Sequence, residues 1–288
     1  MTKKRLISLI VLITFLILFL LGTFLDFEIS KSLFLVKRAP IWMVFNVILS
    51  FFAFGIVSVL GGILIKFGVS FYNKTSHRIL VILLGILVSF AGVFSLFFLL
   101  LSKEGWFNFL AKPLAIIIVL LFAFLFVFYG FRFAYKYIKE EDINRIIFTG
   151  LSIVISLIIS FLLLYLVSNR VNYLISYTRE IEYIPWYKTC ENKLELMELK
   201  HISDSDFSNF PDFLSIYSPI LIIGSISFVV ENEKKIKNII LIVFIGLTVA
   251  INILTRLSDG LAYLSDISLS FLIFIIPYFV SLFIRCKL

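Results

Sequence analysis

Charged residues are scarce in this 288-residue chain, in which Lys, Arg, Asp and Glu together make up 15%. A soluble domain carries roughly 25% charged residues. Hydrophobic residues instead make up 61% of the chain, and Phe alone supplies 34 of them. A water-facing surface cannot carry so many apolar side chains without large exposed patches. The scarcity of charge therefore excludes an ordinary soluble domain and indicates that lipid is the solvent for most of the chain.

Cysteine and histidine are scarcer still. The chain has two of each, Cys190, Cys286, His77 and His201, and they lie far apart. Neither pair has the close spacing that is typical of a metal site, so we expect no metal and no cofactor. The topology derived below places the two cysteines on opposite sides of the membrane, which excludes a disulfide within the chain.

The net charge of +8 invites comparison with nucleic-acid-binding proteins. Those proteins gather Lys and Arg on one folded face. In this sequence the basic residues punctuate apolar runs at intervals, as they do in the loops of a membrane protein. We therefore expect no nucleic-acid partner.

Long apolar runs dominate the sequence. A helix needs roughly 20 apolar residues to cross the hydrocarbon core of a bilayer. Suitable runs occur at about 6–25, 42–65, 79–102, 113–131, 146–167, 213–230, 236–254 and 267–284. The alternating pattern of a transmembrane barrel is missing, and other strands cannot cross lipid with unpaired amides. The sequence predicts an all-α, polytopic transmembrane helix bundle with about eight spans.

The distribution of Lys and Arg predicts the orientation, because cytoplasmic loops carry an excess of them. With the N-terminus inside, the inner segments hold 15 of the 26 basic and 5 of the 18 acidic residues, which gives +10 inside and −2 outside. We interpret the first apolar run as a retained span, since no small-x-small cleavage site of a signal peptide follows it. The expectation is a multi-pass protein of the cell membrane with both termini inside.

These spans divide the chain into a five-span part at 1–167, an outer loop at 168–212 and a three-span part at 213–288. Loops as long as the outer loop are usually functional or disordered. The outer loop contains Tyr173, Tyr177, Tyr183, Trp186 and Tyr187 in its first half. Aromatic residues at this position are also typical of an interfacial belt. The hydrophobic spacing at 191–200 predicts a short surface helix.

Polar residues concentrate at three points of the predicted outer side, and ionisable groups next to lipid are costly enough to call for a reason. The first group runs from Asn172 to Arg179, the second lies at 210–212, and the third runs from Thr255 to Asp266. Arg256 and Asp266 also fit an ordinary ion pair between two helix ends, and Arg179 fits a headgroup contact. The sequence leaves both readings open.

The segment 255–266, TRLSDGLAYLSD, resembles the last signature of the type 2 phosphatidic acid phosphatase superfamily, Ser-Arg-x5-His-x3-Asp. Arg256 and Asp266 stand at the matching positions, ten residues apart. The histidine of the signature falls at Ala262. This motif is weak alone, and the resemblance also depends on two further signatures, which occur in the family order and on the same predicted side of the membrane.

The other two signatures of that superfamily lie upstream. The first, Lys-x6-Arg-Pro, falls on Asn172, Arg179 and Glu180, and the second, Pro-Ser-Gly-His, falls on Pro211 to Leu214. The phosphatase-like region thus covers about 165–284. The family core usually has six spans, so the two extra apolar runs are a departure.

The resemblance implies hydrolysis of a phosphate ester or pyrophosphate on a lipid. In the family one His attacks phosphorus, a second His protonates the leaving group, and basic side chains bind the phosphate oxygens. Here the two histidines are replaced by Ala262 and Leu214. The resemblance therefore implies a catalytically degenerate enzyme, with Asp266 as a catalytic remnant. Its substrate-binding residues would be Asn172, Arg179 and Arg256.

Our leading hypothesis is an integral membrane protein that binds a lipid phosphate or polyprenyl pyrophosphate at the outer leaflet. The alternatives are a small-solute transporter and a structural membrane subunit. A transporter predicts polar groups at mid-bilayer and broken helices in a symmetric pattern. The discriminating geometry is whether Asn172, Arg179, Arg256 and Asp266 meet in one pocket.

Overall fold

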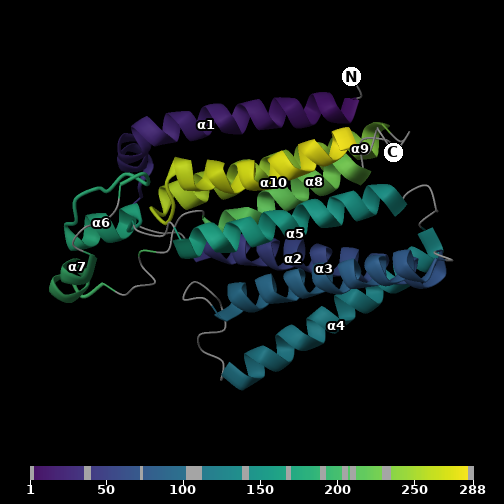
Figure 1. Ribbon diagram of the computed structural model, residues 1–288. Coiled ribbons are helices and arrows are strands. Elements are labelled where there is room, and N and C mark those ends of the chain that lie inside the picture. The colour runs from purple at the N-terminus through teal and green to yellow at the C-terminus, as the bar shows by residue number, and fades with distance from the viewer. Residues whose placement is uncertain are drawn as a thin grey trace. The chain divides into compact units, whose positions relative to one another are not determined.

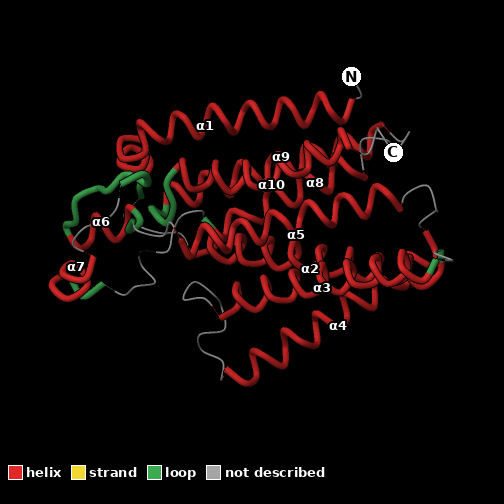
Figure 2. The backbone as a smooth tube through the Cα atoms, viewed as in Figure 1, coloured by secondary structure: helices red, strands yellow, loops and turns green. Residues whose placement is uncertain are grey.

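A computed structural model gives the fold of the chain. It describes residues 3–35, 40–71, 74–101, 112–137, 143–166, 170–188, 193–202, 207, 212–228 and 235–284. Within these residues the secondary structure is helical and no β-strand occurs (Figure 2). The all-α prediction is confirmed for this part of the chain. Cys190, Pro211 and Cys286 lie outside the described residues.

A helix lies over each predicted apolar run (Figure 1). The first five are α1 (Lys3–Leu33), α2 (Pro40–Ser70), α3 (Thr75–Leu101), α4 (Lys112–Tyr137) and α5 (Ile143–Leu166). Two short helices follow, α6 (Tyr173–Arg179) and α7 (Lys193–Leu199). The last are the 3-10 helix η4 (Phe213–Ile216), α8 (Tyr217–Phe228), α9 (Lys235–Ser258) and α10 (Leu264–Ile284). The helix α7 confirms the surface helix predicted at 191–200.

Six helices of the described chain are long and apolar enough to cross a membrane. They are Lys4–Leu33, Ile48–Ser70, Thr75–Phe97, Ile116–Tyr135, Ile143–Leu166 and Leu264–Ile284. The apolar part of α9, Val243–Ser258, is shorter, and α8 has 12 residues. These helices support a multi-pass helical membrane protein. The count of about eight spans and the cytoplasmic placement of both termini stay predictions.

The chain forms two compact units. One unit comprises residues 1–43 and 158–276, and the other comprises 44–157 and 277–288. The first apolar helix therefore belongs with the C-terminal part of the chain rather than with α3 and α4.

Small residues allow close helix packing in the unit of residues 44–157 and 277–288. A Cβ atom added to Gly62 would lie 2.1 Å from the carbonyl oxygen of Val127 in α4. A Cβ atom added to Gly61 would lie 2.1 Å from the Ser89 hydroxyl in α3. Small residues at helix interfaces are typical of membrane proteins, because lipid tails are as apolar as the side chains they would replace. Backbone proximity, rather than escape from water, holds these helices together.

In the unit of residues 1–43 and 158–276, α1 packs against α8 and α9 around an apolar core. The buried side chains of this core are Phe15, Val249, Leu257, Ala262, Leu264, Ile267, Phe271 and Leu272. The rings of Phe15 and Phe271 stack with their centroids 3.8 Å apart. In Figure 1, α6 and α7 lie beyond the C-terminal end of α1, where α10 begins. The buried side chains of Asp26, Arg170, Asp212, Arg256 and Asp266 lie at this end, whereas buried Lys4 lies at the start of α1.

Candidate functional site

The turn between α9 and α10 brings the polar residues of this end together. Gly260 follows the end of α9 with a left-handed φ of +65°, a conformation that glycine adopts without steric cost at a helix C-terminus. The Leu174 amide donates to the Gly260 carbonyl at 2.9 Å, and the Leu35 amide donates to the Ser258 carbonyl at 2.8 Å. The turn is therefore fixed against both α6 and the end of α1.

Asp266 stands in the first turn of α10 and is fully buried. One carboxylate oxygen accepts the Tyr263 amide at 2.9 Å, as in the reciprocal half of a capping box. The other accepts from Arg170 Nη2 at 2.7 Å. The positive end of the helix dipole also favours a carboxylate at this position. Asp266 thus caps its own helix and binds a cation from the segment before α6.

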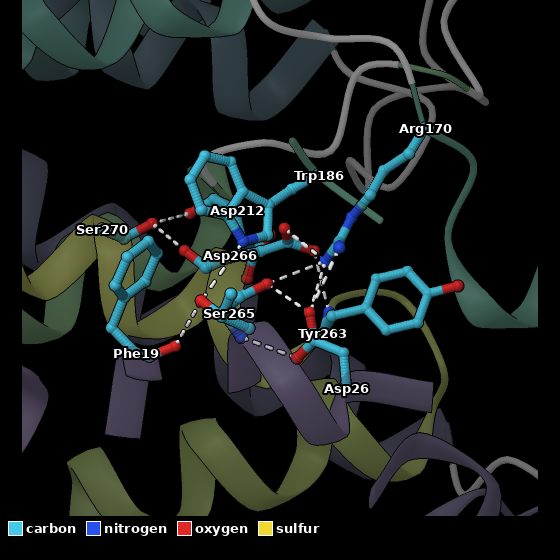
Figure 3. Close-up of polar contacts among 10 residues, drawn as sticks. Phe19, Asp26, Arg170, Trp186, Asp212, Tyr263, Ser265, Asp266 and Ser270 are labelled. Carbon is cyan, nitrogen blue, oxygen red and sulfur yellow. Dashed lines mark hydrogen bonds and ion pairs between the residues drawn. The ribbon is translucent and has the colours of Figure 1, made fainter. Parts of the chain in front are cut away.

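Asp26 of α1 is the second carboxylate on Arg170 (Figure 3). Both Nη1 and Nη2 of Arg170 lie 3.1 Å from Asp26 Oδ2. Asp26 Oδ1 accepts the Ser265 amide at 2.9 Å, and the Ser265 hydroxyl donates to Asp26 Oδ2. The same hydroxyl oxygen accepts from Arg170 Nη2 at 3.0 Å. We call Asp26, Arg170 and Asp266 the Arg170 triad.

Aromatic side chains of the segment 170–188 and of the turn before α10 lie around the Arg170 triad. The Arg170 guanidinium carbon lies 4.0 Å from the centroid of the Tyr263 ring, and the Tyr183 ring meets Tyr263 edge-on at 5.4 Å. The Trp186 indole donates to the Thr23 hydroxyl at 3.3 Å. A desolvated cation–π contact contributes about 2 kcal/mol. The Tyr263 ring therefore packs on the buried Arg170 guanidinium, and Tyr183 packs on Tyr263 in turn.

Electrostatics keep Arg170 charged and its aromatic neighbours neutral. Burial lowers the pKa of Arg170, but Asp266 and Asp26 raise it by more, so its net pKa lies above the ordinary value. Burial raises the pKa of Tyr183 to about 12, and burial also raises the pKa of Tyr263. Near neutral pH, Arg170 is thus a fixed cation and both phenols keep their protons.

A second ion pair joins Arg256, near the end of α9, to Asp212, just before η4. Arg256 Nε donates to Asp212 Oδ2 at 3.0 Å, and Arg256 Nη2 donates to Asp212 Oδ1 at 2.6 Å. The two bonds form the parallel fork that guanidinium makes with a carboxylate. The Ser215 hydroxyl also donates to Asp212. Both charged side chains are buried, with 5% of each exposed.

Ser270 of α10 links the ion pair to the Arg170 triad. Its hydroxyl oxygen lies 3.0 Å from the carbonyl oxygens of both Asp212 and Asp266 (Figure 3). We call the Arg170 triad and the Arg256–Asp212 pair together the polar cluster. With every member ionised, three carboxylates contact two guanidiniums in the polar cluster.

The four residues predicted to form a site have different positions. Arg256 and Asp266 belong to the polar cluster. Asn172 is the N-cap of α6, where its side-chain oxygen accepts the Ile175 amide at 2.9 Å. Arg179 is the last residue of α6 and is exposed. The structure thus brings together two of the four, and the predicted binding roles of Asn172 and Arg179 stay predictions.

Sequence reasoning missed Asp26 and Arg170, and it gave Asp212 no charge partner. The available signal was Asp26 itself, because an acid near the end of a long apolar run calls for a buried partner. Which cation supplies that partner depends on tertiary contact. Arg170 lies 144 residues away in the sequence.

The positions that match the family histidines offer no nucleophile. Ala262 is fully buried in the apolar core described above, with Phe15 and Leu257. Leu214 lies in η4. His201 takes a left-handed φ of +51° after α7 and is exposed. Across the part of the chain that the structure describes, no three His, Cys, Asp or Glu side chains group as metal ligands.

Comparison of the chain with models of protein families, with curated proteins and with solved structures gave no match. The resemblance to the phosphatidic acid phosphatase superfamily therefore rests on the short motifs alone.

Proposed function

We propose that this membrane protein binds the phosphate group of a lipid at the polar cluster without hydrolysing it. The supporting observation is the fork of Arg256, whose Nε and Nη2 both donate to one carboxylate at a buried helix end. The same fork fits two oxygens of a phosphate. Arg256 also stands where the resembling family has a phosphate-binding arginine.

Arg256 is a better phosphate ligand than Arg170. Arg170 is held by two carboxylates, by the Ser265 hydroxyl and by the face of Tyr263. A ligand would have to displace all of these contacts. Arg256 gives its fork to one carboxylate, so exchanging Asp212 for phosphate conserves the number of charge-assisted hydrogen bonds.

Binding without turnover follows from the side chains around the cluster. Covalent phosphoryl transfer needs a nucleophile that an adjacent base activates. Ala262 offers no lone pair and lies in the apolar core. The Ser265 and Ser215 hydroxyls donate to the carboxylates that hold the two arginines. Their role is to position Asp26 and Asp212.

The binding test uses purified protein in lipid nanodiscs. Phosphatidic acid and a polyprenyl pyrophosphate are titrated against phosphatidylcholine, and phosphate release is measured in parallel. We expect both phosphate-bearing lipids to bind, Arg256→Ala to weaken them by at least about tenfold, and Arg256→Lys to recover part of the loss. The exposed Arg179→Ala tests the remaining sequence prediction.

Two outcomes would count against the proposal. Equal affinity for phosphatidic acid and phosphatidylcholine would remove the phosphate-binding function. Robust phosphate release that Arg256→Ala abolishes would remove its non-hydrolytic part.

The surplus of carboxylates supports a second candidate, proton-coupled transport of a small solute. Ionisable residues inside membrane helices commonly mark transport paths, and Asp26 lies within the apolar helix α1. Solute flux in proteoliposomes that depends on a pH gradient and is lost in Asp26→Asn would favour this candidate over lipid binding.

A further inference from the structure

The polar cluster contains more negative than positive groups. Asp26 and Asp266 both form ion pairs with Arg170, and Asp212 forms an ion pair with Arg256. With all five side chains ionised, these contacts sum to a charge of −1. A ligand anion that enters this site therefore meets a net negative surrounding as well as a guanidinium.

Asp212 fills the Arg256 fork, to which the proposed function assigns the phosphate. Its two oxygens fill the Arg256 fork, and the Ser215 hydroxyl holds the carboxylate in place. Once phosphate takes the fork, the Asp212 carboxylate loses its cation while it stays in a buried position. A buried carboxylate without a partner is costly and accepts a proton instead.

We propose that phosphate binding at Arg256 is coupled to the uptake of one proton by Asp212, which acts as an internal competitor for the fork. This inference rests on the proposed function. The Arg256–carboxylate contact breaks and the Arg256–phosphate contact forms. The proton comes from solvent and converts Asp212 to the neutral acid. For a phosphate monoanion, the charge of the cluster then stays at −1.

The surroundings of Asp212 indicate why the proton goes there. Arg256 faces it from α9, Ser215 faces it from η4, and Ser270 of α10 holds its backbone carbonyl. Beyond Ser270, Asp266 and Asp26 keep their shared cation, Arg170, whose contacts the exchange does not touch. Asp212 is thus the carboxylate of the polar cluster that the exchange leaves without a cation.

The aromatic residues near the cluster do not supply the proton. Tyr183 and Tyr263 flank Arg170, and burial raises the pKa of both phenols, that of Tyr183 to about 12. Both are neutral across the physiological range and stay so when a ligand binds. Within the protein, the coupling therefore depends on a carboxylate rather than on these phenols.

Linkage gives the coupling a measurable size. When binding takes up one proton, the apparent dissociation constant rises about tenfold for each unit of pH in the interval where the acceptor is ionised in the free protein and protonated in the complex. Phosphate has its own titration near pH 6, which adds to this dependence. That contribution is the same for every variant, so the difference between wild type and Asp212→Asn isolates the carboxylate.

The experiment titrates short-chain phosphatidic acid into the full-length protein by calorimetry, at about pH 6 and about pH 8. Two buffers of different protonation enthalpy give the number of protons taken up. We expect wild type to take up about one proton more than Asp212→Asn. At the higher pH, Asp212→Asn is expected to bind at least about tenfold more tightly than wild type. Glu182→Gln removes an exposed carboxylate of the segment after α6 and should match wild type.

The outcomes separate this inference from the proposed function. Equal proton uptake and equal pH dependence in wild type and Asp212→Asn, with binding intact, would overturn the coupling alone. Failure of both proteins to bind phosphatidic acid would overturn the proposed function.

Ser215→Ala gives a second test that keeps every charge of the cluster. It removes the hydroxyl that holds Asp212 in the fork, so the internal competitor becomes weaker. We expect affinity for phosphatidic acid to rise by about fivefold, with the pH dependence retained. An unchanged or lower affinity would contradict the role of Asp212 as a competitor, even if Asp212→Asn does not fold.

Discussion

Arg170 and Asp26 meet through two hydrogen bonds of 3.1 Å although 144 residues separate them in the sequence. The contact joins the first helix of the chain to the segment that leads into α6. Its side chains are 2% and 0% exposed. In lipid, apolar contact between helices adds little beyond what lipid tails offer. Polar contacts of this kind therefore fix which helices pair and in which register.

Removing one partner of the Arg170 triad should destabilise the protein strongly. Asp26→Ala removes the carboxylate that accepts from Ser265. Of the two carboxylates of the triad, Arg170 then keeps Asp266. Breaking a buried ion pair from one side costs about 3–5 kcal/mol. We expect the midpoint of thermal unfolding in detergent to fall strongly. Arg170→Ala should lower it to a similar extent.

The matched control is Arg179→Ala, which removes an exposed arginine at the end of α6. Surface substitutions of this kind usually change stability by less than about 0.5 kcal/mol. If Asp26→Ala and Arg179→Ala lower the midpoint equally, the buried contact of Arg170 with α1 does not hold this unit together.

Gly22 controls how closely α1 approaches the start of α10. A Cβ atom at this position would lie 2.5 Å from the Ser265 amide nitrogen and 3.0 Å from Asp26 Oδ1. Gly22→Ala therefore pushes α1 away and lengthens the Asp26–Ser265 contacts. Overpacking of this kind costs about 1–3 kcal/mol, and thermal unfolding measures it.

Gly224 of α8 supplies the control for this substitution. A Cβ atom there would meet nothing within 4 Å. Because alanine is about 1 kcal/mol better than glycine in a helix interior, Gly224→Ala should be neutral or stabilising. A stabilised Gly22→Ala would show that α1 does not approach Ser265 this closely.

Placing a histidine at position 262, where the resembling signature has one, should not produce hydrolysis. Ala262 is fully buried in the apolar core, so Ala262→His places a polar ring among Phe15 and Leu257 and overpacks them. We expect a loss of stability of about 1–3 kcal/mol and no phosphate release from phosphatidic acid. Release by Ala262→His, alone or with Leu214→His, would instead place this position within reach of the substrate.

The helices of the fold follow from composition because lipid restricts the chain to few structures. A backbone in hydrocarbon has to satisfy its own hydrogen bonds, so each long apolar run had to be a helix. The surface helix α7 also follows from local spacing. The number of spans is harder to predict, because the 12-residue α8 is preceded by the 3-10 helix η4 and does not form one continuous long helix.

The polar cluster shows where sequence reasoning ends. The resemblance of the segment 255–266 to a phosphatase signature indicated Arg256 and Asp266, which are ten residues apart. Their partners Asp212 and Arg170 come from distant segments, and no local pattern encodes such pairing. Asn172 was interpreted as a phosphate ligand, and in the structure its side-chain oxygen caps α6. An asparagine just before a short helix is also a local capping signal.

The raised pKa of Tyr183 predicts a loss of stability at high pH. Burial favours the neutral phenol and raises its pKa to about 12, from about 10 in the unfolded chain. The folded protein therefore binds the proton more tightly than the unfolded chain does. This contribution is complete below about pH 10 and is lost as pH rises through about 12. We expect the thermal midpoint of wild type to fall across this interval, and that of Tyr183→Phe to fall less steeply. Tyrosinate absorbance measured in both proteins assigns the titration, and identical midpoint curves would contradict the burial of Tyr183 beside Arg170.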